Sequence, residues 1–230
     1  IYLNTSGEPL YKRGYRAKIH RAALNPCMAA ALIKISKWNE KIPFYDPMCG
    51  SGTIPIEAAM IAHSIPPRLK RKSYAFKNWS SFNHNLFEEC KKESINKINY
   101  ESETSIYASD NTEKNLSLIA NSLKILNLTN KINLSVKDII EFIPDANEGV
   151  IITNPPHGHR MSRELALKRL YRNLGDVLKN KCNNHDAYIF SMNNVLSKCI
   201  GLRTKRKYVL KNGKLDCRLL YFPIKAGKFH

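Results

Sequence analysis

IPFYDPMCGSGT, residues 42–53, followed by the apolar run 54–65, is the stretch that decides the fold of this chain. The apolar start and acidic end of residues 42–46 predict a short buried strand, and the run 54–65 predicts a helix. Gly50 and Gly52 suit the turn between them, because glycine tolerates left-handed backbone angles and leaves room for a ligand against the main chain. Strand, glycine turn and helix form the first half of a βαβ unit, which favours a parallel α/β sheet.

The same alternation continues towards the C-terminus. Further strands are predicted at 105–110, 131–136, 149–153 and 187–191, and further helices at 26–38, 85–100, 112–126 and 163–178. Asn212-Gly213 lies between two apolar runs and predicts an antiparallel hairpin, because this dipeptide is the strongest short hairpin signal. We therefore predict an α/β fold with a Rossmann-like sheet of mostly parallel strands, closed by a C-terminal antiparallel hairpin.

Two segments lie outside this alternation. Residues 1–25 are polar and basic, and we interpret them as an irregular lead-in that ends where Asn25-Pro26 starts a helix. Residues 66–104 carry two adjacent prolines, a basic stretch and a charged helical pattern, which predict an insertion on the helix side of the sheet. The chain from 26 to 230 is therefore predicted to be one domain with this insertion inside it.

The charge of the chain favours a polyanionic partner. The 230 residues include 37 Lys and Arg against 19 Asp and Glu, a formal net charge of +18. Repulsion of this size is offset most naturally by nucleic acid. Basic residues gather at 12–21, 68–72 and 203–207, each at the edge of a predicted element where a phosphate backbone can reach. The alternative is a generally basic composition with lysines spread over every surface.

Several other classes of protein are excluded by composition. The chain has no apolar run of about 18 residues or more, which a membrane-spanning helix needs, and no apolar leader near Ile1. Its 6 cysteines form no Cys-x-x-Cys pair and no zinc-finger spacing with His, so no metal site is predicted. Cysteines within apolar runs favour a reducing compartment, and we expect the cytoplasm.

Four predicted strands end in a distinctive polar residue, namely Asp46, Asp110, Asp138 and Asn154. Ligands of a parallel sheet bind beyond the carboxyl ends of its strands, so these residues are expected to converge on one crevice. An acid ahead of the glycines suits a ligand with an ammonium group, and Pro55 stands where a dinucleotide-binding turn needs a third glycine. Asp110 is suited to a ribose diol and Asp138 to an adenine amino group, although each also suits a cap of the following helix.

Asn154-Pro155-Pro156-His157 is the sharpest local signal for chemistry. The first proline holds Asn154 extended and both rings fix their own φ, which predicts a rigid turn at the mouth of the sheet. The Asn154 side-chain oxygen and a free Pro155 carbonyl then offer two acceptors for the two hydrogens of an aromatic amine, and this positioning is expected to supply most of the rate. His157 is expected to flank the base by stacking.

These segments together resemble class I S-adenosylmethionine methyltransferases, specifically the THUMP-associated RNA guanine methyltransferases. That family includes bacterial enzymes of large-subunit ribosomal RNA and archaeal and eukaryotic enzymes of transfer RNA. The resemblance spans nearly the whole chain and rests on residues 10–16 (LYKRGYR), 22–26 with 29–31, 46–53 with 56–59, 154–160, and 212–213 with 215–217. The segment 10–16 is more specific than the glycine turn, which all class I enzymes share in some form.

The resemblance implies a seven-stranded sheet with a reversed last strand, S-adenosylmethionine as cofactor, and methyl transfer to the 2-amino group of guanine in ribosomal or transfer RNA. The implied catalytic residues are Asn154, Pro155, Pro156 and His157. The implied cofactor contacts are Leu24, Asn25, Asp46, Pro47, Cys49, Gly50, Ser51, Gly52, Thr53, Asp110, Asn111, Asp138, Ile139 and Asn154. The implied RNA contacts are Lys12, Arg13, Arg16 and Arg160.

The chain departs from the family at two points. The family usually has Tyr or Phe where His157 stands, and an imidazole offers less apolar surface to a stacked base. The family also carries an N-terminal THUMP domain that captures RNA, and no part of this chain resembles one. We therefore expect that the chain, which starts at Ile1, is a fragment, or that it relies on its own basic surface and a partner protein.

Two alternative functions stay open at this point. The first keeps the chemistry and changes the acceptor to adenine in DNA or RNA, or to a protein glutamine, since corners like Asn154–His157 serve all of these. The charge weighs against a protein acceptor, and residues 10–16 weigh against adenine. The second is a catalytically weak RNA-binding protein on a methyltransferase scaffold. His157 and the missing capture domain favour it, whereas the intact acids, glycines and Asn154 oppose it.

Overall fold

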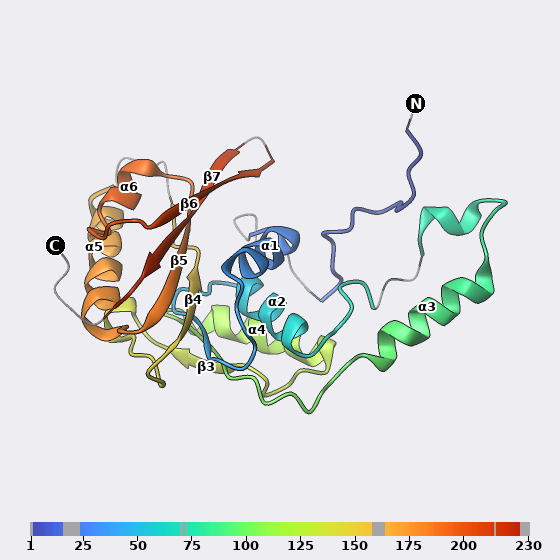
Figure 1. Ribbon diagram of the computed structural model, residues 1–230, viewed down its shortest axis with the longest axis horizontal. Coiled ribbons are helices and arrows are strands. Elements are labelled where there is room, and N and C mark those ends of the chain that lie inside the picture. Colours follow the sequence, from blue (N-terminus) through green and yellow to red (C-terminus); the bar gives the residue numbers. More distant parts are fainter. Residues whose placement is uncertain are drawn as a thin grey trace.

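The computed structural model describes residues 2–15, 24–69, 71, 73–157, 164–213 and 215–225. At its centre lies a seven-stranded sheet in the order β3-β2-β1-β4-β5-β7-β6 (Figure 1). The strands are β1 Phe44–Asp46, β2 Ile106–Asp110, β3 Asn133–Val136, β4 Gly149–Thr153, β5 His185–Ser191, β6 Arg206–Asn212 and β7 Leu215–Pro223. The pairs from β3 to β5 are parallel, and β7 runs antiparallel to both β5 and β6. The predicted α/β sheet with its reversed last strand is confirmed.

Helices cover both faces of this sheet (Figure 1). On one face lie α1 (Pro26–Ser36), α2 (Thr53–Ala62) and α4 (Glu113–Leu126); on the other lie α5 (Glu164–Lys181), α6 (Asn194–Lys198) and the 3-10 turn η2 (Ile139–Glu141). The first helix ends earlier than its apolar pattern predicts, because Lys37 adopts a left-handed φ of 56°. The sequence did not predict α6 and η2, since neither is long enough to show a helical period.

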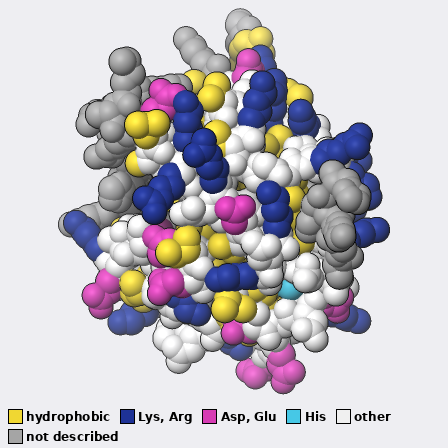
Figure 2. Space-filling model, turned by 90° about the vertical axis from the view of Figure 1, so that its left-hand side faces the viewer, with side chains coloured by type: hydrophobic (Ala, Val, Ile, Leu, Met, Phe, Trp, Pro, Cys, Tyr) yellow, Lys and Arg dark blue, Asp and Glu magenta, His cyan; other side chains and the backbone are white. Residues whose placement is uncertain are grey.

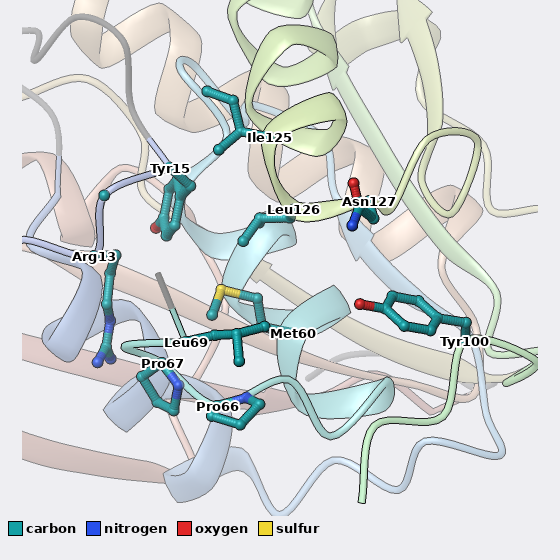
Figure 3. A pocket seen from close by; sticks show the side chains of 11 residues that line it. Arg13, Tyr15, Met60, Pro66, Pro67, Leu69, Tyr100, Ile125, Leu126 and Asn127 are labelled. Atoms are coloured by element: carbon teal, nitrogen blue, oxygen red, sulfur yellow. The ribbon is translucent and has the colours of Figure 1, made fainter. Parts of the chain in front are cut away.

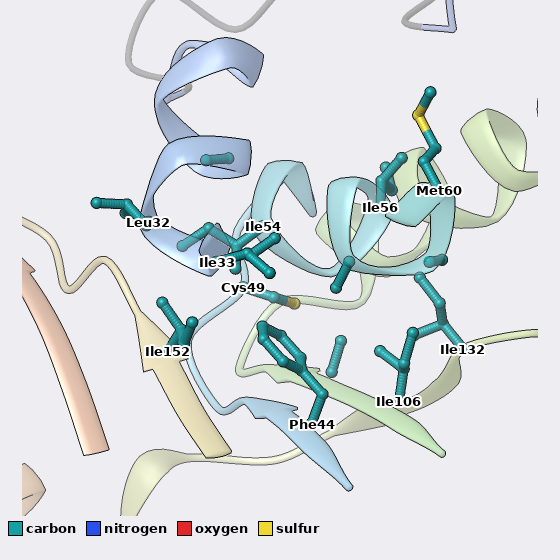
Figure 4. Close-up of a cluster of buried hydrophobic side chains, with 14 of the residues drawn as sticks. Leu32, Ile33, Phe44, Cys49, Ile54, Ile56, Met60, Ile106, Ile132 and Ile152 are labelled. Atoms are coloured by element: carbon teal, nitrogen blue, oxygen red, sulfur yellow. The ribbon is translucent and has the colours of Figure 1, made fainter. Parts of the chain in front are cut away.

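Each face of the sheet has its own hydrophobic core. Successive side chains of a strand point to opposite faces, so Phe44 of β1 packs with α1 and α2 while Tyr45 packs on the α5 side. Figure 4 shows side chains of α1 and α2 gathered above Phe44. All of β4 is buried, as its apolar run predicts. This packing fixes the turn between β1 and α2 at the carboxyl edge of the sheet.

The segment 66–104 projects away from the sheet as an arm (Figure 1). It contains the 3-10 turn η1 (Ala75–Asn78) and α3 (His84–Asn96), and no residue of either is buried. The N-terminal lead-in runs beside η1 of the arm, where the amide of Phe76 donates to the carbonyl of Thr5 at 3.0 Å (Figure 1). The guanidinium of Arg71 donates to the carbonyls of Ser6 and Glu8. Lead-in and arm are therefore joined by main-chain contacts.

Candidate functional site: the carboxyl edge of the sheet

The structure brings the strand ends that the sequence singled out to one edge of the sheet. Asp46 ends β1 and Asp110 ends β2, and these strands are parallel neighbours. Asp138 follows β3 on one side, and Asn154 follows β4 on the other. Because all four strands run in the same direction, the four residues lie along one edge of the sheet, on both sides of the β1–α2 turn. This is the position at which an open α/β sheet binds its ligands.

The glycine turn has a closed side and an open side. Gly50 and Gly52 have positive φ values of 53° and 78°, which disfavour any other residue. A Cβ on Gly52 would lie 2.4 Å from Cγ1 of Ile119 in α4, so the helix packs directly on this glycine. A Cβ on Gly50 would meet no atom within 4 Å. The turn is therefore packed against α4 at Gly52 and leaves space for a ligand at Gly50.

Asp110 is held rigidly by three hydrogen bonds. Its Oδ2 accepts from the amide of Gly50 at 2.9 Å, which ties the end of β2 to the glycine turn. Its Oδ1 accepts from the amide of Thr112 at 3.0 Å and from the side chain of Asn115 at 2.9 Å, both at the start of α4. Capping of the helix and ligand binding do not exclude each other here, since a carboxylate has about four lone-pair sites.

Asp46 is a buried carboxyl group, with only 1% of its surface exposed. Burial raises the pKa of Asp46 to about 7, and the nearby charge of Asp110 adds to this rise. The hydroxyl of Thr153 faces the carboxyl without full hydrogen-bond geometry and offsets part of the rise. Among the described residues, no Lys or Arg forms an ion pair with Asp46. A cationic ligand group at this position would restore the ionised form.

Asp138 and Ile139 differ in how they relate to the crevice. Asp138 caps η2 in a capping box, in which its Oδ1 accepts from the amide of Ile140 at 3.1 Å while Glu141 accepts from the Asp138 amide at 2.8 Å. The side chain of Ile139 is 3% exposed and packs in the core on the α5 side. Any contact of Ile139 with a cofactor would therefore involve its backbone atoms and not its side chain.

The remaining cofactor candidates mostly have structural partners of their own. Asn25 caps α1 by accepting from the amide of Cys27 at 2.9 Å, and Leu24 is buried in the core. The carbonyl of Pro47 accepts from the Ser109 hydroxyl at 3.4 Å. Three others lie on the turn. Cys49 is buried, and this desolvation raises the pKa of its thiol, while Thr53 is buried at the start of α2 and Ser51 is half-buried. Asn111 follows β2, and its side-chain oxygen accepts from the Thr112 hydroxyl at 3.0 Å.

The di-proline corner holds one acceptor without a donor. The Oδ1 atom of Asn154 is shielded from solvent and has no hydrogen-bond partner in the part of the chain that the structure describes. Pro155 is buried and Pro156 is exposed, so the corner lies at the boundary of the core. Shielded acceptors without donors are rare in native proteins, and each calls for an explanation such as a ligand.

The Pro155 carbonyl differs from its prediction. The sequence led us to expect a free carbonyl, but Nδ1 of His157 lies 3.2 Å from this oxygen, within hydrogen-bond distance. The His157 ring accounts for this contact, because a neutral imidazole can carry its proton on Nδ1 and donate it to the carbonyl of Pro155, two residues earlier. In this conformation the imidazole therefore occupies one of the two acceptors that we assigned to an amine.

The lead-in residues predicted to contact RNA differ in their exposure to solvent. Arg13 is turned inward, where its Nε and Nη2 each lie 3.2 Å from a carboxylate oxygen of Glu57 in α2. The Arg13 and Glu57 side chains are 9% and 3% exposed, and the Tyr15 hydroxyl also donates to Glu57 at 3.0 Å. Lys12 is exposed and pairs with Glu8 at 3.1 Å. Arg16 and Arg160 lie outside the described residues.

Arg13 thus anchors the lead-in rather than presenting a charge to solvent. The sequence alone did not indicate Glu57 as the partner of Arg13, since the two lie 44 positions apart. The only signal was an acid within the otherwise apolar run 54–65, which requires a buried partner. Arg13 and Tyr15 also line a pocket with Met60, Pro66 and Tyr100 (Figure 3). This pocket lies at the far ends of α2 and α4 and includes no predicted residue of the crevice.

The described residues contain neither a membrane-spanning helix nor a candidate metal site. None of their helices combines the length and apolarity needed to cross a bilayer. They also contain no group of three or more His, Cys, Asp and Glu side chains arranged to hold a metal ion. All six cysteines are free thiols.

Known proteins similar to this chain are methyltransferases by name. A family model described as "RMKL-like, methyltransferase domain" matches residues 13–220. The Synechocystis sp. (strain ATCC 27184 / PCC 6803 / Kazusa) protein named "Putative RNA methyltransferase slr0064" is 32% identical over 228 residues, which are 97% of this chain and 58% of that protein.

Two solved structures are similar along nearly the whole chain. SMU.472, titled "a putative methyltransferase complexed with SAH", has a TM-score of 0.88 and 29% identity and matches 97% of this chain and 58% of its own. A "predicted N6-adenine-specific DNA methylase" from Listeria monocytogenes str. 4b F2365 has a TM-score of 0.85 and 30% identity, over 95% of this chain and 56% of its own. The chain thus spans a little over half the length of these relatives.

Proposed function

Because the chain belongs to the RMKL-like methyltransferase domain family, we propose that it transfers a methyl group from S-adenosylmethionine to the 2-amino group of a guanine in structured RNA. The observation that carries this proposal is the solvent-shielded Oδ1 of Asn154, which has no donor among the described residues. It follows β4, the strand next to β1 and its glycine turn. An unpartnered buried acceptor costs stability, so its position beside a ligand crevice fits a group kept for a substrate.

The cofactor is assigned to the turn between β1 and α2, where it supplies an electrophilic methyl group on a sulfonium centre. The residues at this turn fit it. The open side of Gly50 leaves room against the main chain, and the buried Asp46 carboxyl gains a cationic partner in the ammonium group. Asp110 is held by three donors and keeps lone pairs for the ribose hydroxyls. Asp138 accepts from the adenine amino group.

The acceptor base is assigned to the di-proline corner. Asn154 Oδ1 and the Pro155 carbonyl each accept one hydrogen of the guanine amine, which aims the nitrogen lone pair at the methyl group. Transfer would form the N–C bond as the S–C bond breaks, leaving S-adenosylhomocysteine, and the methylated nitrogen would release one proton to solvent. Holding two reactants in this geometry accounts for most of the rate, because it replaces a bimolecular encounter by an oriented one. The Pro155 carbonyl has a second lone pair for the amine, and release of this oxygen by His157 strengthens that bond and frees the imidazole ring to stack on the base.

RNA is the acceptor that fits the charge of the chain. A formal charge of +18 favours a phosphate backbone over a protein substrate, and the similar Synechocystis protein is named an RNA methyltransferase. The residues that bind RNA include the exposed Lys12, with a separate capture domain or partner protein supplying further contacts. The six free thiols fit a reducing, cytoplasmic setting.

The product nucleoside tests this proposal. Unmodified ribosomal and transfer RNA would be incubated with the protein and methyl-labelled S-adenosylmethionine, digested to nucleosides and separated by mass. We expect N2-methylguanosine from the wild type and none from an Asn154→Ala variant that still binds S-adenosylhomocysteine. A wild type that binds S-adenosylhomocysteine and labels no nucleoside would instead favour a scaffold that only binds RNA.

An adenine amino group is the second candidate acceptor. It is favoured by the name of the similar Listeria monocytogenes protein, an N6-adenine-specific DNA methylase. Adenine also offers an exocyclic amine with two hydrogens, so the two acceptors of the corner serve it equally well. Methyladenosine without methylguanosine in the same digest, or methyl transfer to DNA alone, would replace guanine by adenine.

A further inference from the structure

The positive charge of the chain is concentrated in its C-terminal part. Residues 164–225 hold 14 Lys and Arg against 4 Asp and Glu, whereas residues 24–157 hold 15 against 14. The latter range includes the glycine turn and the arm, and it is almost neutral. A generally basic composition would raise the charge of both ranges. The excess therefore lies on α5, α6 and the β6–β7 hairpin, at the end of the molecule that Figure 2 faces.

This end of the molecule presents basic side chains on an uncovered face of the sheet. Lys207, Val209 and Lys211 alternate along β6 on the α6 side, and all three are exposed, Val209 by 74%. Arg218 of β7 is paired with Val209 across the hairpin, so it lies on the same face and is exposed as well. In Figure 2, Lys and Arg gather in the upper part of this view, where Figure 1 shows α6 and the hairpin.

The hairpin reaches the same edge of the sheet as the di-proline corner, two strands away from it. Arg218 is in register with Ser191, the last residue of β5, and β5 is also the neighbour of β4. Two strand spacings of about 4.8 Å each separate β7 from β4, which puts the Arg218 backbone roughly 10 Å from the line of β4, the strand that Asn154 follows. Beyond Arg218 the hairpin continues for three more residue pairs past the end of β5. It therefore overhangs the edge at which the base is held.

The chemistry of this strip suits a nucleic-acid strand. The Arg218 guanidinium donates to Asn194 of α6 and has further N–H donors, since it carries five in total. Asp216 of β7 is in register with Lys211 and lies on the same face, but none of the ion pairs within the described residues involves β6 or β7. Two lysines and one arginine against this single acid leave the strip with a net positive charge. The exposed Val209 between the two lysines offers apolar contact to a sugar or base.

We infer that Lys207, Val209, Lys211 and Arg218 form a docking strip for the RNA strand that flanks the methylated nucleotide. This inference rests on the proposed function, because it takes RNA as the substrate. Lysines on an exposed edge strand also prevent strands of two molecules from pairing, and β6 is an edge strand. If the lysines only protected the edge strand, replacing them would leave RNA affinity unchanged. RNA affinity therefore distinguishes edge protection from RNA docking.

The test compares two triple variants with equal loss of charge. The strip variant is Lys207→Ala, Lys211→Ala and Arg218→Ala. The control is Lys34→Ala, Lys41→Ala and Lys124→Ala, three exposed lysines outside the basic end. Each protein is titrated with a labelled 20-nucleotide single-stranded RNA of mixed sequence at several salt concentrations, and with S-adenosylhomocysteine by calorimetry.

We expect the strip variant to bind the RNA about 10-fold or more weakly and to lose about 2 from the slope of log affinity against log salt, since each single-strand phosphate contact contributes about 0.7. The control should stay within about twofold of the wild type, and both should bind S-adenosylhomocysteine normally. Equal losses in both variants, an unchanged strip variant, or its aggregation at wild-type RNA affinity would overturn the inference. Failure of the wild type to methylate RNA would refute the proposed function separately, because RNA affinity is measured without turnover.

Discussion

The two sides of the carboxyl edge differ in how completely their polar groups are partnered. On the glycine turn, Asp110 is fixed by three hydrogen bonds and Gly52 packs on Ile119 of α4, so this side is rigid before any ligand arrives. On the di-proline corner, the Asn154 oxygen has no donor among the described residues, and His157 occupies the Pro155 carbonyl. Under the proposed function, the side assigned to the cofactor is preorganised, whereas the side assigned to the acceptor base completes its hydrogen bonds only with substrate.

The largest effect should come from Asn154→Ala, which removes the unpartnered acceptor. We expect turnover to fall by roughly 100-fold or more, as it does when a preorganised polar contact to the reacting group is lost. Affinity for S-adenosylhomocysteine should stay near that of the wild type, because the side chain belongs to the acceptor side. Single-turnover methylation and calorimetry measure the two quantities. Equal losses of both would mean that the two sides are not separate.

Gly52→Ala should test the rigidity of the cofactor side. The added Cβ meets Ile119 at 2.4 Å and the residue keeps a φ of 78°, so we expect a loss of about 2–4 kcal/mol in the free energy of unfolding. Gly50→Ala is the matched control, since its Cβ meets nothing within 4 Å. Gly50→Ala should lower the free energy of unfolding less than Gly52→Ala does, and it should weaken cofactor binding more. Chemical denaturation measures the stability of the two variants, and calorimetry measures their cofactor affinity. If Gly52→Ala weakened cofactor binding more than Gly50→Ala, the ligand would not lie against Gly50.

Asp46→Asn should remove a pH dependence. Burial raises the folded pKa to about 7 from an ordinary value of 3.8, so the stability contributed by the protonated form is full below about pH 4 and is lost as pH rises through 7. The variant should therefore be more stable than the wild type at pH 8, by up to about 4 kcal/mol, and equal to it at about pH 4. Thermal unfolding at both pH values measures this difference.

Cofactor affinity should change in the opposite sense at the same residue. An ammonium group binds the ionised Asp46, so the affinity of the wild type for S-adenosylhomocysteine should rise between pH 5 and about 7, where the carboxyl ionises. In Asp46→Asn this rise should be absent. A variant that keeps the same rise would show that another group titrates.

The smallest effect is expected from His157→Phe. A phenyl ring still stacks on a base but cannot donate to the Pro155 carbonyl, so the acceptor is free without rearrangement. A net hydrogen bond of about 1 kcal/mol corresponds to a KM for RNA that falls by roughly threefold to fivefold. His157→Ala, which loses the stacking ring as well, should raise the same KM. An increase in both variants would rule out the idea that the imidazole competes with the amine.

Most of the fold could be predicted because it is encoded locally. The strand 149–153 and the hairpin at Asn212-Gly213 follow from short apolar patterns and a turn dipeptide, and the structure has both. Predicted and observed helices differ at their ends, where a single backbone angle such as that of Lys37 decides the last residue. The short helix α6 has too few residues for a pattern to be visible.

The candidate site was predicted where topology determines it and missed where packing does. Asp46, Asp110 and Asn154 lie at strand ends, so the parallel order of the sheet alone brings them to one edge. The pair of Arg13 with Glu57 joins residues far apart in sequence, and no local pattern encodes it. The contact of His157 with Pro155 depends on one side-chain rotation, which a sequence does not specify.

A crystal structure of the chain with S-adenosylhomocysteine would show whether the cofactor lies on the glycine turn with its sulfur facing Asn154. We predict the homocysteine part against Gly50, the ribose hydroxyls on Asp110, and the sulfur directed towards the Asn154 side chain. The ligand bound instead in the pocket between Arg13 and Tyr100, or bound at the turn with its sulfur directed away from Asn154, would contradict the account.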